Sequence, residues 1–220
     1  MDPDVGAMRR EYEAGGLAES EAPADPFALF TTWFAAAVEA SAAGASGEAN
    51  AMVVSTIGRD GQPSSRTVLL KGFDAEGFVF FTNYGSRKGT ELAASARCSL
   101  LFPWYALQRQ VRVEGIAEQV PRSESEAYFA TRPRESQVGA WASRQSHRVA
   151  DRAELEAAYA SVTDRFEGGE VPCPPFWGGY LVRPSAFEFW QGRRGRMHDR
   201  LSYERTDPAR SSWTRSRLAP

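Results

Sequence analysis

Short β-rich runs separated by turn residues dominate the middle of the chain, between residues 51 and 120. The first run, 52–57, is followed by the pair Asp60-Gly61, which is typical of a hairpin turn. Because short turns join the successive runs, the pattern predicts an antiparallel meander, which usually closes into a barrel. The further strands of this region are expected at 65–71, 78–82, 98–102 and 110–120.

Helices are expected around this region. Asp25-Pro26 is typical of an N-cap and first helical residue, and apolar residues at helical spacing extend this helix to about Ser41. A short helix is expected near Glu91, and a Ser-x-x-Glu capping box at Ser123 indicates another helix start. Residues 151–166 predict a helix with an apolar stripe at Leu155, Ala158, Val162 and Phe166. Strand-like composition returns at 176–190, 201–203 and 213–218, the last two as a closing hairpin.

The domain organisation is expected to be simple. Residues 1–24 are polar and contain Gly15-Gly16 and Pro23, so we expect a flexible N-terminal arm there. No linker or internal repeat separates the rest of the chain. Residues 25–220 are therefore expected to form a single domain, within the usual size range of one.

Composition excludes several classes of protein. The formal net charge is −2, so no overall basic field attracts the chain to nucleic acid. The longest unbroken apolar run, Trp33 to Val38, is much shorter than the roughly 20 residues of a membrane span. No apolar signal core opens the chain, and Cys98 and Cys173 lie far apart, so we expect reduced thiols in a cytoplasmic protein. Two cysteines are too few for a Cys-based metal site, and no metal is expected.

Two segments of the β-rich region suit anions. Arg66 and Lys71 lie on one expected strand five residues apart, so they should face opposite sides and serve two different anions. Residues 82–89 place Ser86, Arg87 and Lys88 before a helix, which suits a phosphate group. Each segment alone is also consistent with solvated charged side chains. Lys71 and Lys88 are the two lysines of the chain.

Two further segments carry polar groups at regular spacing. Gln110 lies on an alternating strand, where an amide can contact the polar edge of a flat heterocycle, although such residues more often face solvent. Tyr128, Arg132 and Ser136 are spaced by four and together suit a phosphate group. Pro133 is expected to break the helix near Arg132, which leaves their common face open.

The segment 188–200 contains one of the two histidines. If this segment is extended, Arg196, His198 and Arg200 point the same way. Two neighbouring guanidinium groups should disfavour the protonated imidazole and leave a neutral hydrogen-bond partner. A lone histidine is more often structural or exposed. The sequence has no Gly-x-Ser-x-Gly elbow and no histidine pair at metal spacing, so hydrolase and metalloenzyme functions lack their residues.

Taken together and in this order, the motifs resemble the pyridoxamine 5′-phosphate oxidase family. The resemblance runs from Arg9-Arg10-Glu11-Tyr12 to the terminal Arg217-Leu218-Ala219-Pro220, and Met197 stands where a leucine is usual. It implies a mainly β fold with flanking helices, an antiparallel split β-barrel that binds FMN at a homodimer interface. The most specific stretches are 66–71, 81–88, 132–146 and 176–200.

The resemblance also implies a role for individual residues. The FMN phosphate would be held by Arg66, Arg87 and Lys88, with Gln145 and Ser146 nearby. Further FMN contacts would come from Thr67, Val68, Leu69, Leu70, Lys71, Phe81 and Thr82, and from Gln110, Trp190 and Arg200 at the flavin ring system and its side chain. The substrate phosphate would meet Lys71, Tyr128, Arg132 and Ser136. Arg196 and His198 would flank the substrate ring as the catalytic pair, and Arg9 and Tyr12 would close over it.

The implied reaction converts pyridoxamine 5′-phosphate or pyridoxine 5′-phosphate to pyridoxal 5′-phosphate. A hydride passes from the substrate C4′ to the flavin N5, and dioxygen reoxidises the flavin to give hydrogen peroxide; the amine substrate also releases ammonia. Flavin oxidases of phenazine biosynthesis and deazaflavin-dependent reductases are alternatives within the superfamily. A non-catalytic flavin- or B6-binding protein is an alternative from another class. The arm residues and the Lys71 set favour the B6 substrate, and the charge balance opposes a nucleic-acid module.

Overall fold

The computed structural model describes residues 12, 15–45, 47–205 and 212–220. Its helices are α1 (Pro26–Ala42), α2 (Arg87–Ala94), α3 (Arg122–Ala130), α4 (Arg134–Ala142) and α5 (Arg152–Arg165). Its strands are β1 (Ala51–Ile57), β2 (Pro63–Leu69), β3 (Gly72–Asp74), β4 (Gly77–Asn83), β5 (Arg97–Trp104), β6 (Arg109–Gln119), β7 (Trp177–Gln191), β8 (Asp199–Glu204) and β9 (Thr214–Arg217).

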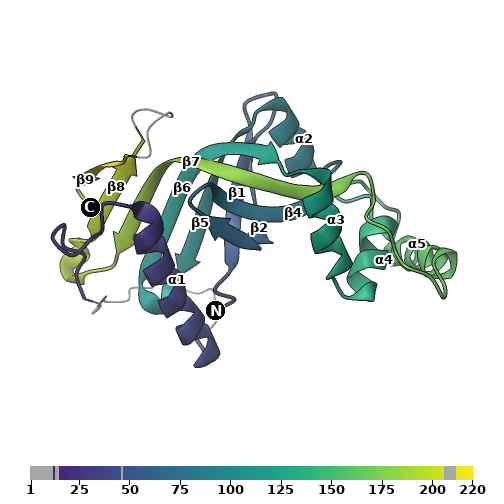
Figure 1. The fold of residues 1–220 in the computed structure, drawn as a ribbon, viewed down its shortest axis with the longest axis horizontal. Helices are drawn as coiled ribbons and strands as arrows, with labels where there is room; N and C mark the ends of the chain where they lie inside the picture. The colour runs from purple at the N-terminus through teal and green to yellow at the C-terminus, as the bar shows by residue number, and fades with distance from the viewer. Residues whose placement is uncertain (1–11, 13–14, 46, 206–211) are drawn as a thin grey trace, which may run out of the picture. The chain divides into compact units, whose positions relative to one another are not determined.

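The strands belong to one hydrogen-bonded, mostly antiparallel sheet (Figure 1). The strand order is β2-β1-β5-β6-β7-β4-β3, and β8 pairs with both β7 and β9. The predicted simple meander is therefore wrong for β4, which pairs with β7 along Phe78–Asn83. Helix α2 follows β4 in the sequence instead of a pairing strand. The partner of β4 is β7, which comes much later in the chain. The split-barrel class expected from the resemblance is confirmed.

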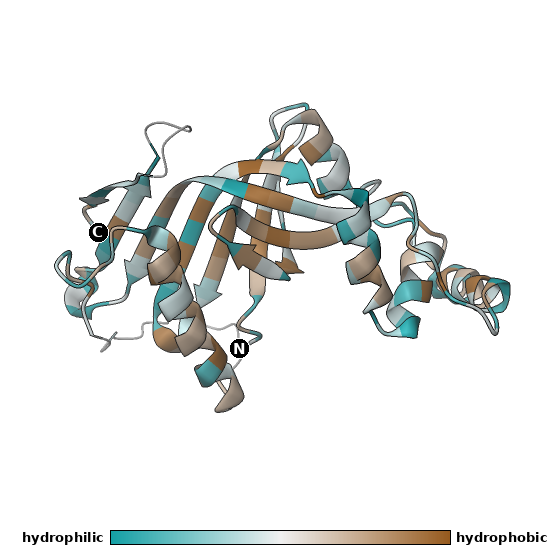
Figure 2. Cartoon of the chain, in the orientation of Figure 1, coloured by the Kyte–Doolittle hydropathy of each residue, from teal (hydrophilic) through white to brown (hydrophobic). Residues whose placement is uncertain are grey.

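By its contacts the chain divides into two compact units, and β1, β5, β6 and β7 contribute residues to both. The first unit comprises residues 1–53, 99–114 and 184–220, and the second comprises 54–98 and 115–183. Along a strand, apolar and polar residues alternate as a half-buried strand requires (Figure 2). The clearest case is β6, whose buried positions recur at every second residue from Val111 to Ala117. The predicted division into an arm and one domain stays a prediction.

Helix α1 is the main helix of the first unit. The Asp25 side chain accepts a hydrogen bond from the Phe27 amide at 3.0 Å, and Pro26 opens the helix, as predicted. Its aromatic residues pack edge to face on the sheet, with ring centroids 4.9 Å apart for Phe30 and Phe102 and 5.4 Å apart for Trp33 and Phe189. This stripe places the helix firmly against the strands.

The described part of the predicted arm packs against the C-terminal strands. Leu17 and Ala22 are buried, although the segment was expected to lie outside the core. Asp199 on β8 accepts from the Leu17 amide at 3.0 Å, and Arg217 on β9 donates to the Leu17 carbonyl at 2.8 Å. Leu17 thus makes backbone hydrogen bonds to the C-terminal strands that the polar composition of its segment does not predict. The predicted closing hairpin is confirmed as β8 and β9.

The helices of the second unit surround a small apolar cluster of Phe129, Val138, Val171 and Trp177. The predicted capping box is wrong, because Pro121 precedes the first turn of α3 and makes no side-chain cap. Glu126 instead accepts from Arg122 at 2.8 Å. The stripe predicted on α5 is only partly confirmed: Val162 and Phe166 are half-buried against the cluster, whereas Leu155 is exposed.

Two negative findings apply to the described residues. No helix among them has both the length and the apolar character needed to cross a membrane. Across the same residues, no three His, Cys, Asp or Glu side chains are grouped in a way that could hold a metal ion.

Candidate functional site

A cavity of about 460 Å³ lies in the second unit, and it collects predicted site residues from segments far apart in the sequence. Strands β2 and β4 form part of its wall, and α2, α3 and α4 bring polar groups to it. The predicted residues that line it are Thr67, Val68, Leu69, Lys71, Phe81, Thr82, Lys88, Tyr128, Arg132, Ser136 and Gln145. Cofactor-phosphate and substrate-phosphate candidates therefore share one cavity.

Lys88 supplies a buried positive charge to this cavity. It lies in the first turn of α2, where Ser86 is the N-cap, and only 8% of the residue is exposed. Its Nζ donates to Thr82 Oγ1 at 3.0 Å and to Gln145 Oε1 at 2.9 Å, and both partners are neutral. Burial, with a smaller contribution from the charge of Arg66, lowers the pKa of Lys88 to about 8. A buried ammonium group with neutral partners suits an anionic ligand.

Arg132 supplies a second cationic position. Its guanidinium carbon lies 4.7 Å from the centre of the Trp177 ring, and burial lowers its pKa. Its Nη1 atom is buried and has no hydrogen-bond partner. An unpaired guanidinium nitrogen is costly in a protein interior. The residue Arg132 lines the cavity together with Tyr128 and Ser136, and a guanidinium group beside two hydroxyl groups suits a phosphate group.

Pro133 explains how these side chains converge. It separates α3 from α4, so the helix break predicted near Arg132 is confirmed. Tyr128 at the end of α3 and Ser136 at the start of α4 thus lie on different helices and still line the same cavity. Their spacing of four is not the reason for their proximity.

Three nearly parallel aromatic rings stack beside the cationic groups. Phe81 and Tyr128 stack with ring centroids 4.0 Å apart and an interplanar angle of 17°. Trp177 is nearly parallel to both, at 11° to Phe81 and 6° to Tyr128. All three residues line the cavity, so an aromatic stack lies next to two cationic groups, which suits an aromatic ligand that carries phosphate.

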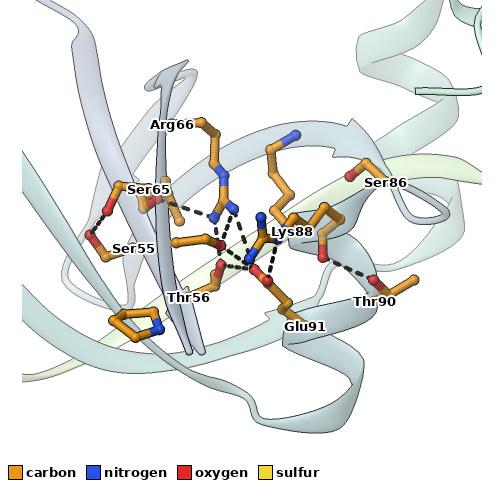
Figure 3. A network of polar contacts seen from close by, with 12 residues as sticks. Ser55, Thr56, Ser65, Arg66, Ser86, Lys88, Thr90 and Glu91 are labelled. Carbon is orange, nitrogen blue, oxygen red and sulfur yellow. Dashed lines mark hydrogen bonds and ion pairs between the residues drawn. The ribbon is translucent and has the colours of Figure 1, made fainter. Parts of the chain in front are cut away.

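Arg66 and Arg87 lie outside the lining of this cavity, while their sequence neighbours Thr67 and Lys88 belong to it. Both arginines contact Glu91, a buried carboxylate on α2 (Figure 3). Arg66 Nη2 lies 3.3 Å from Glu91 Oε2, and Arg87 Nε donates to Oε1 at 2.8 Å. The opposite-face argument for Arg66 and Lys71 is wrong in its premise, because β2 ends at Leu69 and Lys71 lies beyond the strand.

A second cavity, of about 340 Å³, lies in the first unit and is lined in part by Tyr12, Gln110 and Trp190. The Tyr12 ring meets the Trp190 ring edge to face at 5.7 Å and the His198 ring at 5.6 Å. His198 Nδ1 accepts from the Arg193 amide at 3.1 Å, so the neutral ring carries its proton on Nε2. The first unit therefore gathers an indole, a phenol and an imidazole.

The extended arrangement expected for residues 196–200 is wrong at its start. Residues 194–196 form a 3-10 turn, and Arg196 has a positive φ of 61°, so alternation does not align Arg196 with His198. Arg200 lies opposite Trp190 in the pairing of β7 and β8. Its Nε donates to Glu188 at 2.8 Å, and this hydrogen bond raises its pKa.

Some predicted residues lie elsewhere. Leu70 is buried but does not line the larger cavity, and neither does Ser146, which has a positive φ of 70°. Arg9 lies outside the described residues. Sequence reasoning assigned no role to Trp177 or Glu91. The spacing of Arg87 and Glu91, four residues apart on a helix, was the available signal for Glu91.

Comparisons with known proteins agree with this geometry. The family model described as pyridoxamine 5′-phosphate oxidase matches residues 39–166, and that of the pyridoxine 5′-phosphate oxidase C-terminal dimerisation region matches 177–220. The pyridoxine/pyridoxamine 5′-phosphate oxidase of a Nocardioides species is 56% identical over 99% of this chain and 98% of its own length. That of Rubrobacter xylanophilus is 56% identical over 99% and 97%.

Solved structures show the same fold. PhzG from Burkholderia lata, crystallised with tetrahydrophenazine-1-carboxylic acid, superposes with a TM-score of 0.84 at 31% identity over 94% of this chain and 99% of its own. A pyridoxamine 5′-phosphate oxidase-related, FMN-binding protein from Nostoc punctiforme has a TM-score of 0.67 at 15% identity over 87% and 97%.

Proposed function

The chain belongs to the pyridoxamine 5′-phosphate oxidase family, and on that premise we propose that it oxidises pyridoxine and pyridoxamine 5′-phosphates to pyridoxal 5′-phosphate with FMN. One observation carries the proposal. The larger cavity has two separate cationic positions, the buried ammonium group of Lys88 and the guanidinium group of Arg132, beside a stack of aromatic rings. Two positions fit two phosphate esters, one on the cofactor and one on the substrate.

The residues present fit FMN. Its phosphate would be held by Lys88 together with Arg66 and Arg87, with Gln145 nearby. Strand β2 would contribute backbone and packing contacts through Thr67 to Leu69. The chemistry that FMN would supply when bound is that of a hydride acceptor for the substrate C4′, whose electrons would then reduce dioxygen to hydrogen peroxide.

The chain's own groups bind and orient the substrate. Arg132 donates to the substrate phosphate, and the Tyr128 and Ser136 hydroxyl groups and the Lys71 ammonium group complete its ligands. In the dimer proposed below, His198 and Arg196 of one copy orient the pyridine ring of a substrate held by the other, with Tyr12 covering it. These contacts raise the rate by alignment, since they fix C4′ where the cofactor can take the hydride.

We assign the assembly to a homodimer with the cofactor at the interface between two copies. The segment that matches the family's C-terminal dimerisation region, 177–220, contains Trp190, Arg196, His198 and Arg200. The same residues were expected around the flavin and the substrate ring. Their presence in a dimerisation segment supports an active site to which both copies contribute.

The likeness to PhzG favours one alternative, a phenazine-type flavin oxidase. Two observations favour the B6 phosphates instead. Relatives named for that activity share 56% of their residues with this chain, against 31% for PhzG. In addition, the cavity brings together Arg132, Lys71, Tyr128 and Ser136, a set of side chains that suits a substrate phosphate.

The visible spectrum of the FMN-loaded protein tests the proposal under anaerobic conditions. Addition of pyridoxine 5′-phosphate should bleach the oxidised-flavin bands, and air should restore them as pyridoxal 5′-phosphate forms. Unphosphorylated pyridoxine is the control and should bleach the flavin far more slowly. A bound flavin that stays oxidised would contradict the substrate and favour the phenazine-type alternative. A protein that does not bind FMN would contradict the cofactor as well.

A further inference from the structure

Glu91 is a buried carboxylate in the middle of the groups expected to hold the cofactor phosphate. Only 7% of the residue is exposed. Its Oε2 accepts from Thr56 on β1 at 2.5 Å and from Ser64 on β2 at 2.6 Å. The same oxygen lies 3.3 Å from Arg66 Nη2, and its Oε1 accepts from Arg87 at 2.8 Å. Figure 3 shows Arg66 and Glu91 pointing toward each other from β2 and α2.

The Glu91 carboxylate is ionised near neutral pH. Burial alone would raise the pKa of Glu91, but hydrogen bonds from Ser64, Thr56 and Arg87 and the charge of Arg66 lower it to about 2. A negative charge at this place repels a phosphate directly. Its contribution to phosphate binding must therefore come through the groups that it holds.

Two of those groups are the arginines. Arg66 is fixed from several sides, since it also donates to the Val54 carbonyl and to the hydroxyl groups of Thr56 and Ser64. The Arg87 side chain is 58% exposed, and the salt bridge to Glu91 orients its guanidinium group. A free arginine side chain loses rotamer entropy when it is immobilised. A partner that orders it beforehand reduces that loss at the moment of binding.

The charge balance points the same way. Arg66, Arg87 and Lys88 carry three positive charges, and Glu91 brings their sum to +2. A phosphate monoester carries a charge of about −1.5 to −2 near neutral pH. The four side chains together thus match the charge of the ligand.

We propose that Glu91 is a positioning residue for the cofactor phosphate, which it prepares by holding the guanidinium groups of Arg66 and Arg87 without touching the phosphate itself. The inference rests on the proposed function, because it takes the phosphate of FMN as the anion. The proposal predicts that substitution of Glu91 weakens binding of the cofactor phosphate and of no other part of the cofactor. The flavin ring binds elsewhere and is unaffected.

The test compares FMN with riboflavin, which has the same ring system and no phosphate. Each flavin is titrated into the apoprotein, and its fluorescence gives the dissociation constant. Glu91→Ala should raise the dissociation constant of FMN roughly ten-fold and leave that of riboflavin unchanged. Glu91→Gln should lie between, because its amide oxygen still accepts from Thr56 and Ser64 while its NH₂ group cannot accept from Arg87. Glu156→Ala is the matched control, since Glu156 forms the same pair with Arg152 on the exposed face of α5.

Each outcome decides between distinct conclusions. Equal weakening of FMN and riboflavin would show that Glu91 only supports the fold, and this would overturn the inference. So would an Ala variant that binds FMN like the parent, while the cofactor proposal would stand. A parent protein that binds FMN no more tightly than riboflavin would overturn the cofactor proposal and this inference with it. If the Ala variant does not fold, the Gln variant carries the same comparison.

Discussion

The ammonium group of Lys88 titrates in an accessible pH range, because burial lowers its pKa to about 8. In the free protein this group loses its proton as the pH rises through that value. A bound phosphate favours the charged form, so binding at higher pH must take up a proton. We expect the dissociation constant of FMN to rise above about pH 8, by up to roughly ten-fold per pH unit.

Flavin titrations of the apoprotein between about pH 7 and 9.5 measure this dependence. Riboflavin is the control, and its affinity should change little because it presents no phosphate to Lys88. An FMN affinity that is constant across the range would mean that Lys88 does not contact the phosphate.

The same buried charge predicts a stability effect in the free protein. The folded-state pKa of about 8 lies below the ordinary value of 10.5, so the unfolded chain binds more protons between these values. The contribution of Lys88 to the free energy of unfolding therefore rises with pH across this window. Below about pH 8 the buried charge costs stability, and Lys88→Met removes that cost.

Urea unfolding of the parent and Lys88→Met apoproteins measures this effect. We expect the variant to be more stable near pH 7.5, with the difference shrinking toward about pH 9.5. Comparing the two proteins at each pH cancels the titration of tyrosine and cysteine groups. A difference that is independent of pH would contradict the lowered pKa.

Arg132 is expected to act on substrate binding rather than on the chemical step. Arg132→Ala removes the unpaired Nη1 donor and should raise KM for pyridoxine 5′-phosphate roughly 10- to 100-fold, with a smaller change in kcat. Steady-state kinetics with FMN in excess measure both constants. Arg152→Ala, on the exposed face of α5, is the control and should leave them unchanged. An unaltered KM would contradict the assignment of the substrate phosphate to this position.

At the scale of elements, residues that lie close together in the sequence correctly predicted where helix α1 begins. The N-cap Asp25 and the helix-opening Pro26 act within one turn, and α1 begins where they indicate. The partner of β4 could not be predicted in this way, because β7 lies about a hundred residues further along the chain. The capping box at Ser123 failed because Pro121 and Arg122 already open α3 upstream of it.

Gly178, on the stretch of β7 that pairs with β4, is a position with no room for a side chain. Gly178 lies opposite Thr82, and a Cβ atom there would lie 2.2 Å from the Tyr84 hydroxyl and 2.7 Å from Ser125 Oγ. Tyr84 donates to the Gly179 carbonyl at 3.1 Å, so this ring cannot move without losing a hydrogen bond. We expect Gly178→Ala to lower the free energy of unfolding by about 1–3 kcal/mol.

Urea unfolding of the apoprotein measures that loss. Gly72→Ala on β3 is the matched control, because a Cβ atom there meets no other atom within 4 Å. It should cost little or nothing. If the two variants were equally stable, the close contact between β7 and Tyr84 would not be a constraint on this part of the site.

At the scale of the whole molecule, the resemblance predicted the fold class and many of the residues that line the larger cavity. A whole motif such as residues 66–71 indicates a known tertiary arrangement, which a single residue cannot do. Glu91 was missed because its spacing from Arg87 does not distinguish a buried carboxylate from an exposed one. An Arg–Glu pair four residues apart is common on exposed helices. Here Glu91 also accepts hydrogen bonds from Thr56 on β1 and Ser64 on β2, which the spacing within α2 does not show.

The assembly can be tested by combining two defective copies. If the cofactor lies at an interface to which both copies contribute, Arg132→Ala and His198→Ala need not damage the same site within a mixed dimer. A mixed dimer would hold one site with both substitutions and one with neither. Random pairing makes half of all dimers mixed, so about a quarter of all sites would be intact.

Co-expression of the two variants, with different affinity tags to isolate the mixed dimer, provides the measurement. At low substrate concentration we expect the mixed dimer to recover about half of the parent activity, because one of its two sites is intact. Each variant alone, purified in the same way, is the control and should stay far below that value. If the mixed dimer showed only the average of the two variants, both residues would act in a site built by one copy, and the shared interface would be wrong.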